Sequence, residues 1–157
     1  MRASLMAMVF LASLLLGAPA LAQLTPGDIP DGWSSVEPAE GTIAALRHGD
    51  TLGRLEVVKL AISNEDFGQA QQDLTGRLTS EGFSPVGRPE PVKLGAVEAQ
   101  QRRFTTTMLE REFSLLLVEA LHDGQLWQLT VVFSPTQDTN AETIERDAHA
   151  YFSSLIN

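Results

Sequence analysis

The stretch AVEAQQRRFTTTMLEREFSLLLVEALHDGQLWQLTVVF, residues 96–133, contains three largely apolar runs separated by short polar breaks. In the last run every second residue from Trp127 to Phe133 is large and apolar, which is the period of a β-strand that buries one face. We therefore predict long strands over residues 96–109, 111–121 and 125–133. Short breaks between such strands favour an antiparallel meander.

The second break contains a His–Asp pair, His122 and Asp123, followed by Gly124. This pair is either catalytic machinery or a corner of the chain. A nucleophilic triad needs a Ser, Cys or Thr within hydrogen-bond reach of the base, and adjacent side chains in a strand normally diverge. Asp tolerates the left-handed backbone region and Gly prefers it. We interpret the segment as a tight turn between two strands.

The rest of the chain adds shorter strands and two helices. Strands are predicted over residues 33–37, 42–48 and 54–62 from their β-branched and apolar content. Apolar residues at spacings of three and four then predict a helix between Ser63, which caps it, and Gly82, which ends it. Residues 85–91 hold three prolines and are expected to be an irregular or edge segment. An apolar stripe predicts a second helix over 140–155.

Strands that are grouped before and after helices indicate the α+β class. We expect one twisted antiparallel β-sheet with two main helices packed on it.

The first 22 residues have the pattern of a signal peptide. Arg2 precedes an apolar core, and the ending APALAQ contains an A-x-A cleavage motif. We expect cleavage after Ala22, which leaves residues 23–157 as a single domain without stable membrane insertion. The chain has no cysteine, so neither disulfides nor thiol chemistry are available. We expect a periplasmic or secreted protein.

The mature chain is strongly acidic. Arg2 is the only charged residue of the signal segment, so residues 23–157 hold ten basic and twenty acidic residues and a net charge of −10. This charge repels phosphate backbones and disfavours nucleic acid as a partner. High net charge also keeps a protein soluble, which is a sufficient explanation by itself.

The order of elements resembles the PsbP-like superfamily, which includes the extrinsic PsbP protein of photosystem II, bacterial DcrB-type envelope proteins and a Ran-binding import factor. The resemblance rests on IPDGW before the first strand, the helix from Glu65 to Glu81 leading into GF, the strand LGAVEAQQRRFTTT, the segment LWQLTVVFSP and the helix from Asn140 to Leu155. It implies a helix–sheet sandwich that serves mainly to bind other proteins. It carries over no catalytic residue.

Three residues are candidates for a binding surface. Trp33 follows a Pro–Asp–Gly turn and is the tryptophan expected at the surface, whereas Trp127 lies on an apolar strand face and is expected in the core. Arg102 and Arg103 are neighbours in a strand, so they point to opposite faces. Either arginine can anchor an anionic group, although ion pairing within an acidic protein explains both.

One set of side chains has the spacing of a metal site. Glu142, Glu145 and His149 recur at intervals of three and four on the last helix and therefore share one face. A solvated helix face with ordinary ion pairs explains the same pattern.

Three functions remain open at this point. The first is a non-enzymatic binding or accessory protein that contacts an unknown envelope protein through a sheet face or edge and uses no cofactor. The second is a small periplasmic hydrolase with a carboxylate and histidine site, which requires a cleft that holds perturbed titratable groups. The third is a metal-binding sensor or carrier.

Overall fold

The computed structural model describes residues 28–157, and the predicted signal peptide lies outside this range. Seven strands and two helices follow in the order β1 (Trp33–Ser35), β2 (Thr42–His48), β3 (Arg54–Ala61), α2 (Asn64–Ser80), β4 (Ser84–Leu94), β5 (Val97–Met108), β6 (Arg111–His122), β7 (Gln125–Phe133) and α3 (Ala141–Ile156). No helix in these residues is long and apolar enough to cross a membrane.

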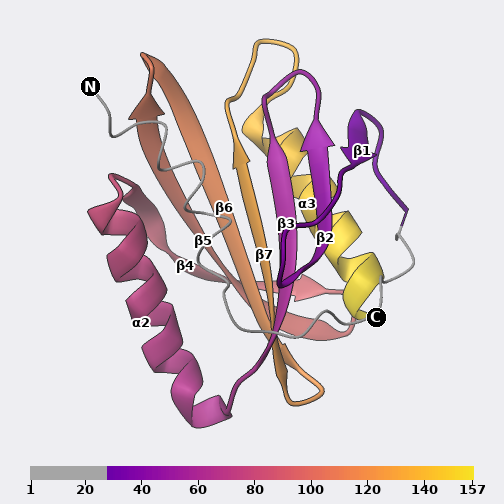
Figure 1. Ribbon diagram of the computed structural model, residues 1–157, viewed down its shortest axis with the longest axis vertical. Coiled ribbons are helices and arrows are strands. Elements are labelled where there is room, and N and C mark those ends of the chain that lie inside the picture. The colour runs from indigo at the N-terminus through magenta and orange to yellow at the C-terminus, as the bar shows by residue number, and fades with distance from the viewer. Residues whose placement is uncertain (1–27) are drawn as a thin grey trace.

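All seven strands form one open antiparallel sheet in the order β1-β2-β3-β7-β6-β5-β4. The two helices cover opposite faces of this sheet, with α2 on one side and α3 on the other (Figure 1). The predicted α+β fold, an antiparallel sheet with two helices packed on it, is therefore confirmed. The predicted meander is β5-β6-β7, and β7 then pairs with β3 at the centre of the sheet.

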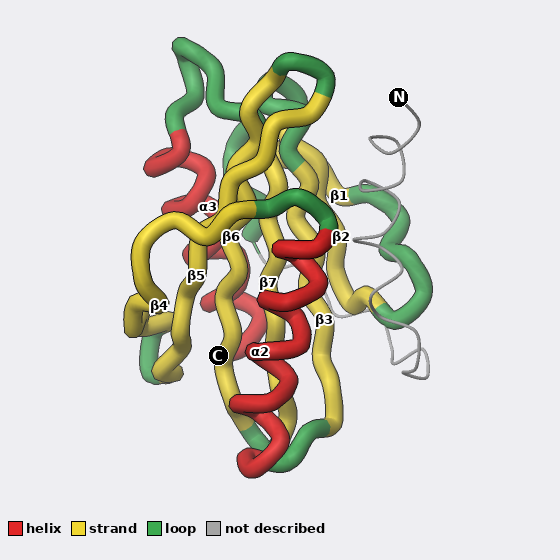
Figure 2. Tube along the Cα trace, turned by 90° about the vertical axis from the view of Figure 1, so that its left-hand side faces the viewer, coloured by secondary structure: helices red, strands yellow, loops and turns green. Residues whose placement is uncertain are grey.

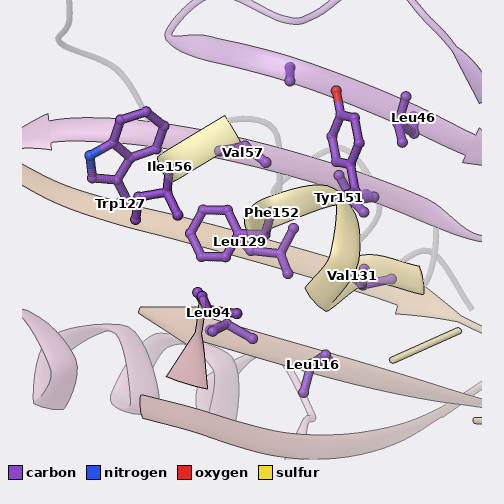
Figure 3. Packing of buried hydrophobic residues seen from close by; sticks show 14 of the residues in the cluster. Leu46, Val57, Leu94, Leu116, Trp127, Leu129, Val131, Tyr151, Phe152 and Ile156 are labelled. Carbon is purple, nitrogen blue, oxygen red and sulfur yellow. The ribbon is translucent and has the colours of Figure 1, made fainter. Parts of the chain in front are cut away.

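The main core lies between the sheet and α3. The helix inserts Tyr151, Phe152 and Ile156 against the alternating residues of β7, as Figure 3 shows. Trp127 belongs to this core, as its strand position predicted. Burial of a large apolar side chain contributes roughly 1.5–3 kcal/mol, so this face is the main source of stability.

A smaller core lies on the α2 side. It is made by Leu78 near the end of α2, by Phe83 just after it, and by residues of the sheet that include Phe104, Leu115 and Leu117. Leu78 is the only buried residue of α2. The helix is therefore held mainly at its C-terminal end, and its first half lies over a polar part of the sheet.

The predicted cap of α2 is present, and α3 is capped as well. Ser63 Oγ accepts a hydrogen bond from the Asp66 N–H at the start of α2, and Asn140 Oδ1 accepts one from the Thr143 N–H at the start of α3. The proline-rich segment forms β4, an exposed strand at one edge of the sheet. Its prolines lack N–H donors, which protects this edge against pairing with another chain.

Candidate functional site

A cleft of about 720 Å³ opens between the first half of α2 and strands β4, β5 and β6. Figure 2 looks onto this side of the molecule, with α2 in front of the sheet. The apolar lining consists of Phe67, Pro91, Val92, Ala99 and Leu121. The polar lining consists of Gln71, Lys93, Glu98, Gln100 and Glu119. A volume and a mixed lining of this kind are typical of ligand-binding clefts.

The floor of the cleft contains a buried ion pair. Glu119 of β6 has only 2% of its side chain exposed, and it contacts the Arg102 guanidinium of β5, which is 11% exposed. Arg102 also donates from Nη1 to the carbonyl oxygen of Gln71 at 3.1 Å and contacts Thr75 Oγ1. Gln128 Nε2 donates to the second carboxylate oxygen of Glu119 at 3.3 Å. The pair therefore ties two strands to helix α2.

Two amides close the network toward the cleft. Gln71 Nε2 donates to Gln100 Oε1 at 2.7 Å and lies 3.5 Å from Glu119 Oε1. A ligand that offers its own amide groups can replace this amide–amide hydrogen bond without leaving either side chain unpaired, which is the condition for low-cost polar recognition.

Helix α2 has a second, smaller hollow on its other side. This groove of about 220 Å³ is lined by residues that include Ala70, Leu74, Leu126 and Gln128, and Glu119 lines it as well. The buried carboxylate thus borders both hollows, one on each side of the helix. Because polar side chains fill the space beneath the first half of α2, the helix contacts the sheet there through hydrogen bonds and not through an apolar core.

Arg102 and Arg103 do point to opposite faces, and both make ion pairs. Arg103 lies on the α3 side, where its Nε and Nη2 donate to the two oxygens of Glu145 at 2.8 and 2.9 Å. Its Nη1 donates to Glu90 Oε2 at 2.7 Å. The hydrogen bond from Arg103 holds the pKa of the Glu90 carboxyl below its usual range. These contacts tie α3 to the edge of the sheet.

The structure brings Arg103, Glu145 and His149 together but does not arrange a metal centre. Burial lowers the pKa of His149, while nearby Glu145 raises it and Arg103 lowers it further. Glu142 is exposed in the first turn of α3. Among residues 28–157 no group of three or more His, Asp and Glu side chains is placed to hold a metal ion. The metal hypothesis therefore has no geometric support from this helix face.

Trp33 is buried, with 7% of its surface exposed, so the expectation of a surface tryptophan is wrong. Trp33 is the strand partner of His48, and the two rings pack edge to face with centroids 5.1 Å apart. His48 Nδ1 accepts a hydrogen bond from the Thr51 N–H at 3.3 Å. A Cβ on the preceding Gly32, which has φ 84°, would lie 2.9 Å from His48 Nε2. This contact between β1 and β2 has no local sequence signal.

His122 and Asp123 form the predicted turn. His122 pairs with Gln125, and the two residues between them have φ values of 50° (Asp123) and 71° (Gly124). His122 Nε2 lies 3.4 Å from Asp123 Oδ2 at this exposed corner. The corner interpretation is therefore confirmed.

Sequence reasoning did not single out Glu119 or its amide partners. The available signal was a glutamate in the middle of the apolar run LLLVEAL, residues 115–121, where a charge is costly unless it is paired. Its partner Arg102 is 17 residues away in the chain, and strand pairing must be known before the two can be connected.

No protein-family model and no curated protein sequence matches this chain. A solved structure from Bacteroides thetaiotaomicron is similar with a TM-score of 0.55 and 12% identity over 82% of this chain, which spans only 42% of that protein. LpqN of Mycobacterium tuberculosis is similar with a TM-score of 0.54 and 15% identity, over 81% of this chain and 78% of LpqN. The Ran-binding protein Mog1p of Saccharomyces cerevisiae has a TM-score of 0.50 and 9% identity, over 82% of both chains.

The structural similarity establishes the fold, and sequence identities this low leave the function open. The resemblance seen in the order of elements is therefore confirmed at the level of architecture. The chain is similar in structure to proteins of the Mog1/PsbP-like fold.

Proposed function

We propose that this chain is an exported, non-enzymatic binding protein that holds an extended segment of a partner protein in the cleft beside α2. The observation that supports this most directly is the cleft itself, whose mixed lining includes the Gln71–Gln100 amide pair. A polypeptide offers both backbone amides for these side chains and apolar side chains for the wall formed by Phe67 and Val92.

Charge in the cleft is balanced, which favours binding over catalysis. The floor carboxylate of Glu119 is engaged by Arg102, and the rim carries one acid, Glu98, and one base, Lys93. A general acid or base needs a free position toward the substrate. No histidine lines the cleft, and His149 belongs to α3 on the opposite face of the sheet.

Two proteins of similar fold support a binding role in the envelope. LpqN is involved in cell envelope biogenesis, and Mog1p binds Ran.

The signal-peptide pattern of residues 1–22 agrees with an envelope location for this chain. Export is tested by the N-terminal sequence of the protein purified from the periplasm or medium, which should begin at Gln23; a cytoplasmic protein beginning at Met1 would contradict it.

The binding proposal is tested by site-specific photocrosslinking in the cells that make the protein. A benzophenone amino acid replaces Phe67, which lines the cleft, and in a matched control it replaces Gln72, which is exposed on the same helix. We expect one dominant protein adduct from position 67 and none from 72. Equal adducts from both positions, or none from either, would refute a partner in the cleft. Hydrolysis of a substrate by the purified protein, lost in Glu119→Gln, would favour the enzyme instead.

A further inference from the structure

Two turns of the sheet lie at the same end of the molecule. The β2–β3 turn precedes β3 and the β5–β6 turn precedes β6, and these two strands run in the same direction because both are antiparallel to β7. Strand β7 ends at this end too, and the Ser134 N–H donates to the Thr51 carbonyl oxygen at 2.9 Å. Figure 1 shows both turns at the top of the sheet. We call this the apical end, defined by residues 49–53, 108–112 and 134–140.

The apical β5–β6 turn has the wrong residues for its shape. Met108 pairs with Arg111, and the two residues between them are Leu109, with φ 51°, and Glu110, with φ 61°. A two-residue turn with both positions left-handed favours Asn or Asp followed by Gly. The β6–β7 turn at the opposite end of strand β6 follows this rule, since it contains Asp123 and Gly124. The same strand therefore begins in a strained turn and ends in a relaxed one.

The same strain recurs in the neighbouring turn. Leu52 has φ 53° and is 45% exposed, and Leu109 is 84% exposed. Among residues 28–157, three of the four non-glycine residues with positive φ lie at the apical end, and so do two of the three large apolar residues that are exposed. Leucine is poorly suited to this backbone region and gains nothing by facing water. Strain of this kind, when it is retained at exposed positions, points to a function of the side chains.

The charges around the two leucines identify the kind of partner. Asp50, Glu110, Glu112 and Asp138 are exposed at this end, and Arg111 is the exposed base within it. The exposed bases Arg47 and Arg54 flank the β2–β3 turn, and Arg54 is already paired with Glu56. An acidic rim disfavours an anionic bilayer, which attracts basic segments. It complements a protein surface with lysines or arginines.

We infer that the apical end is a docking surface on which Leu52 and Leu109 enter apolar pockets of a partner protein whose rim is basic. This inference rests on the proposed function as a binding protein, but it uses a surface separate from the cleft. Leu109 at the apex of the long β5–β6 hairpin is the principal anchor, and Leu52 is a second contact from the adjacent turn. Apolar anchors surrounded by a polar rim are the usual arrangement of interface hot spots.

The test first installs the photocrosslinker at positions 109 and 52, with position 123 on the opposite turn and exposed position 86 on β4 as controls. We expect the same partner adduct from 109 and 52 and none from 123 or 86. The identified partner is then purified, and its affinity is measured for the wild type, for L109N/E110G, for L52N and for the control V86N.

The decisive result combines stability with binding. L109N/E110G installs the residues that the turn prefers, so its thermal midpoint should equal or exceed that of the wild type, while affinity for the partner falls at least tenfold. L52N should also weaken binding, V86N should not, and added salt should weaken binding of the wild type. A partner that binds L109N/E110G as tightly as the wild type would overturn the inference. It would also be overturned if the wild type bound lipid vesicles in place of a protein and L109N/E110G lost that binding.

The two proposals fail differently. An adduct from position 67 without adducts from 52 and 109 would leave the cleft proposal standing and remove the apical surface. Adducts from 52 and 109 alone would do the reverse. No adduct from any of these positions would contradict both.

Discussion

Arg103 donates two parallel hydrogen bonds of 2.8 and 2.9 Å to Glu145, and these bonds join strand β5 to helix α3. We predict that Arg103→Met lowers the free energy of unfolding by about 1–2 kcal/mol, because a bidentate, partly buried pair is lost. Arg146→Ala is the control, since Arg146 pairs with Asp147 at the exposed surface and its loss should cost less than about 0.5 kcal/mol. Urea titration measures both, and equal effects would contradict the prediction.

The elements themselves were largely predictable, because their signals are local. The strand over residues 42–48 matches β2, the strand over 125–133 matches β7, and Ser63 caps α2 as predicted. Asp123 and Gly124 indicated their turn because left-handed geometry follows from residue type.

The candidate sites were not predictable in the same way. The contacts of Trp33 with His48, of Arg102 with Glu119 and of Arg103 with Glu145 join positions that only the pairing of strands brings together. The β5–β6 turn was placed near Glu110, but nothing in Leu–Glu signals a left-handed turn. Sequence reasoning missed this turn's shape because its residues oppose the local rule.

Helix α2 should be stabilised by alanine at its two internal glycines. A Cβ at Gly68 or Gly76 would meet nothing within 4 Å, so alanine adds helix propensity without a clash. Each change should raise the free energy of unfolding by about 0.5–1 kcal/mol. Gly82→Ala is the contrasting control and should destabilise, because Gly82 has φ 93°. Thermal and urea unfolding measure these effects, and no gain in stability at either helical glycine would contradict the prediction.

His149 should make the protein less stable as the pH falls. Burial lowers the pKa of its imidazole below 6.5, so the unfolded chain takes up a proton before the folded chain does. Stability from this group is therefore complete above about pH 6.5 and is lost as the pH falls toward the folded-state pKa. His149→Gln should flatten the curve of stability against pH between 7 and 5. Parallel curves for the two proteins would contradict this.

Glu81 should have the opposite pH dependence. Burial raises the pKa of its carboxyl, an effect that Arg77 partly offsets, and Oε2 is buried without a hydrogen-bond partner. The folded chain therefore holds this proton more tightly than the unfolded chain, and the associated stability is lost as the pH rises above 4.5. We predict that Glu81→Gln is more stable than the wild type at pH 7 and equal to it in acid. Glu65→Gln, in the exposed first turn of α2, should show no such gain.

Variants of the buried pair of Arg102 and Glu119 allow the stability of the fold to be tested separately from binding in the cleft. Glu119→Leu leaves the guanidinium uncompensated beneath α2 and should cost about 3–5 kcal/mol, and Arg102→Met should cost a similar amount. The double variant R102M/E119L removes both charges and replaces them with apolar groups of similar size, so it should recover most of that loss. Chemical unfolding of the three proteins measures this non-additivity. If the pair serves to shape the cleft for a polar partner segment, the double variant will be stable yet lose the adduct at position 67. A stable double variant that keeps this adduct would show that the polar floor is not needed for binding.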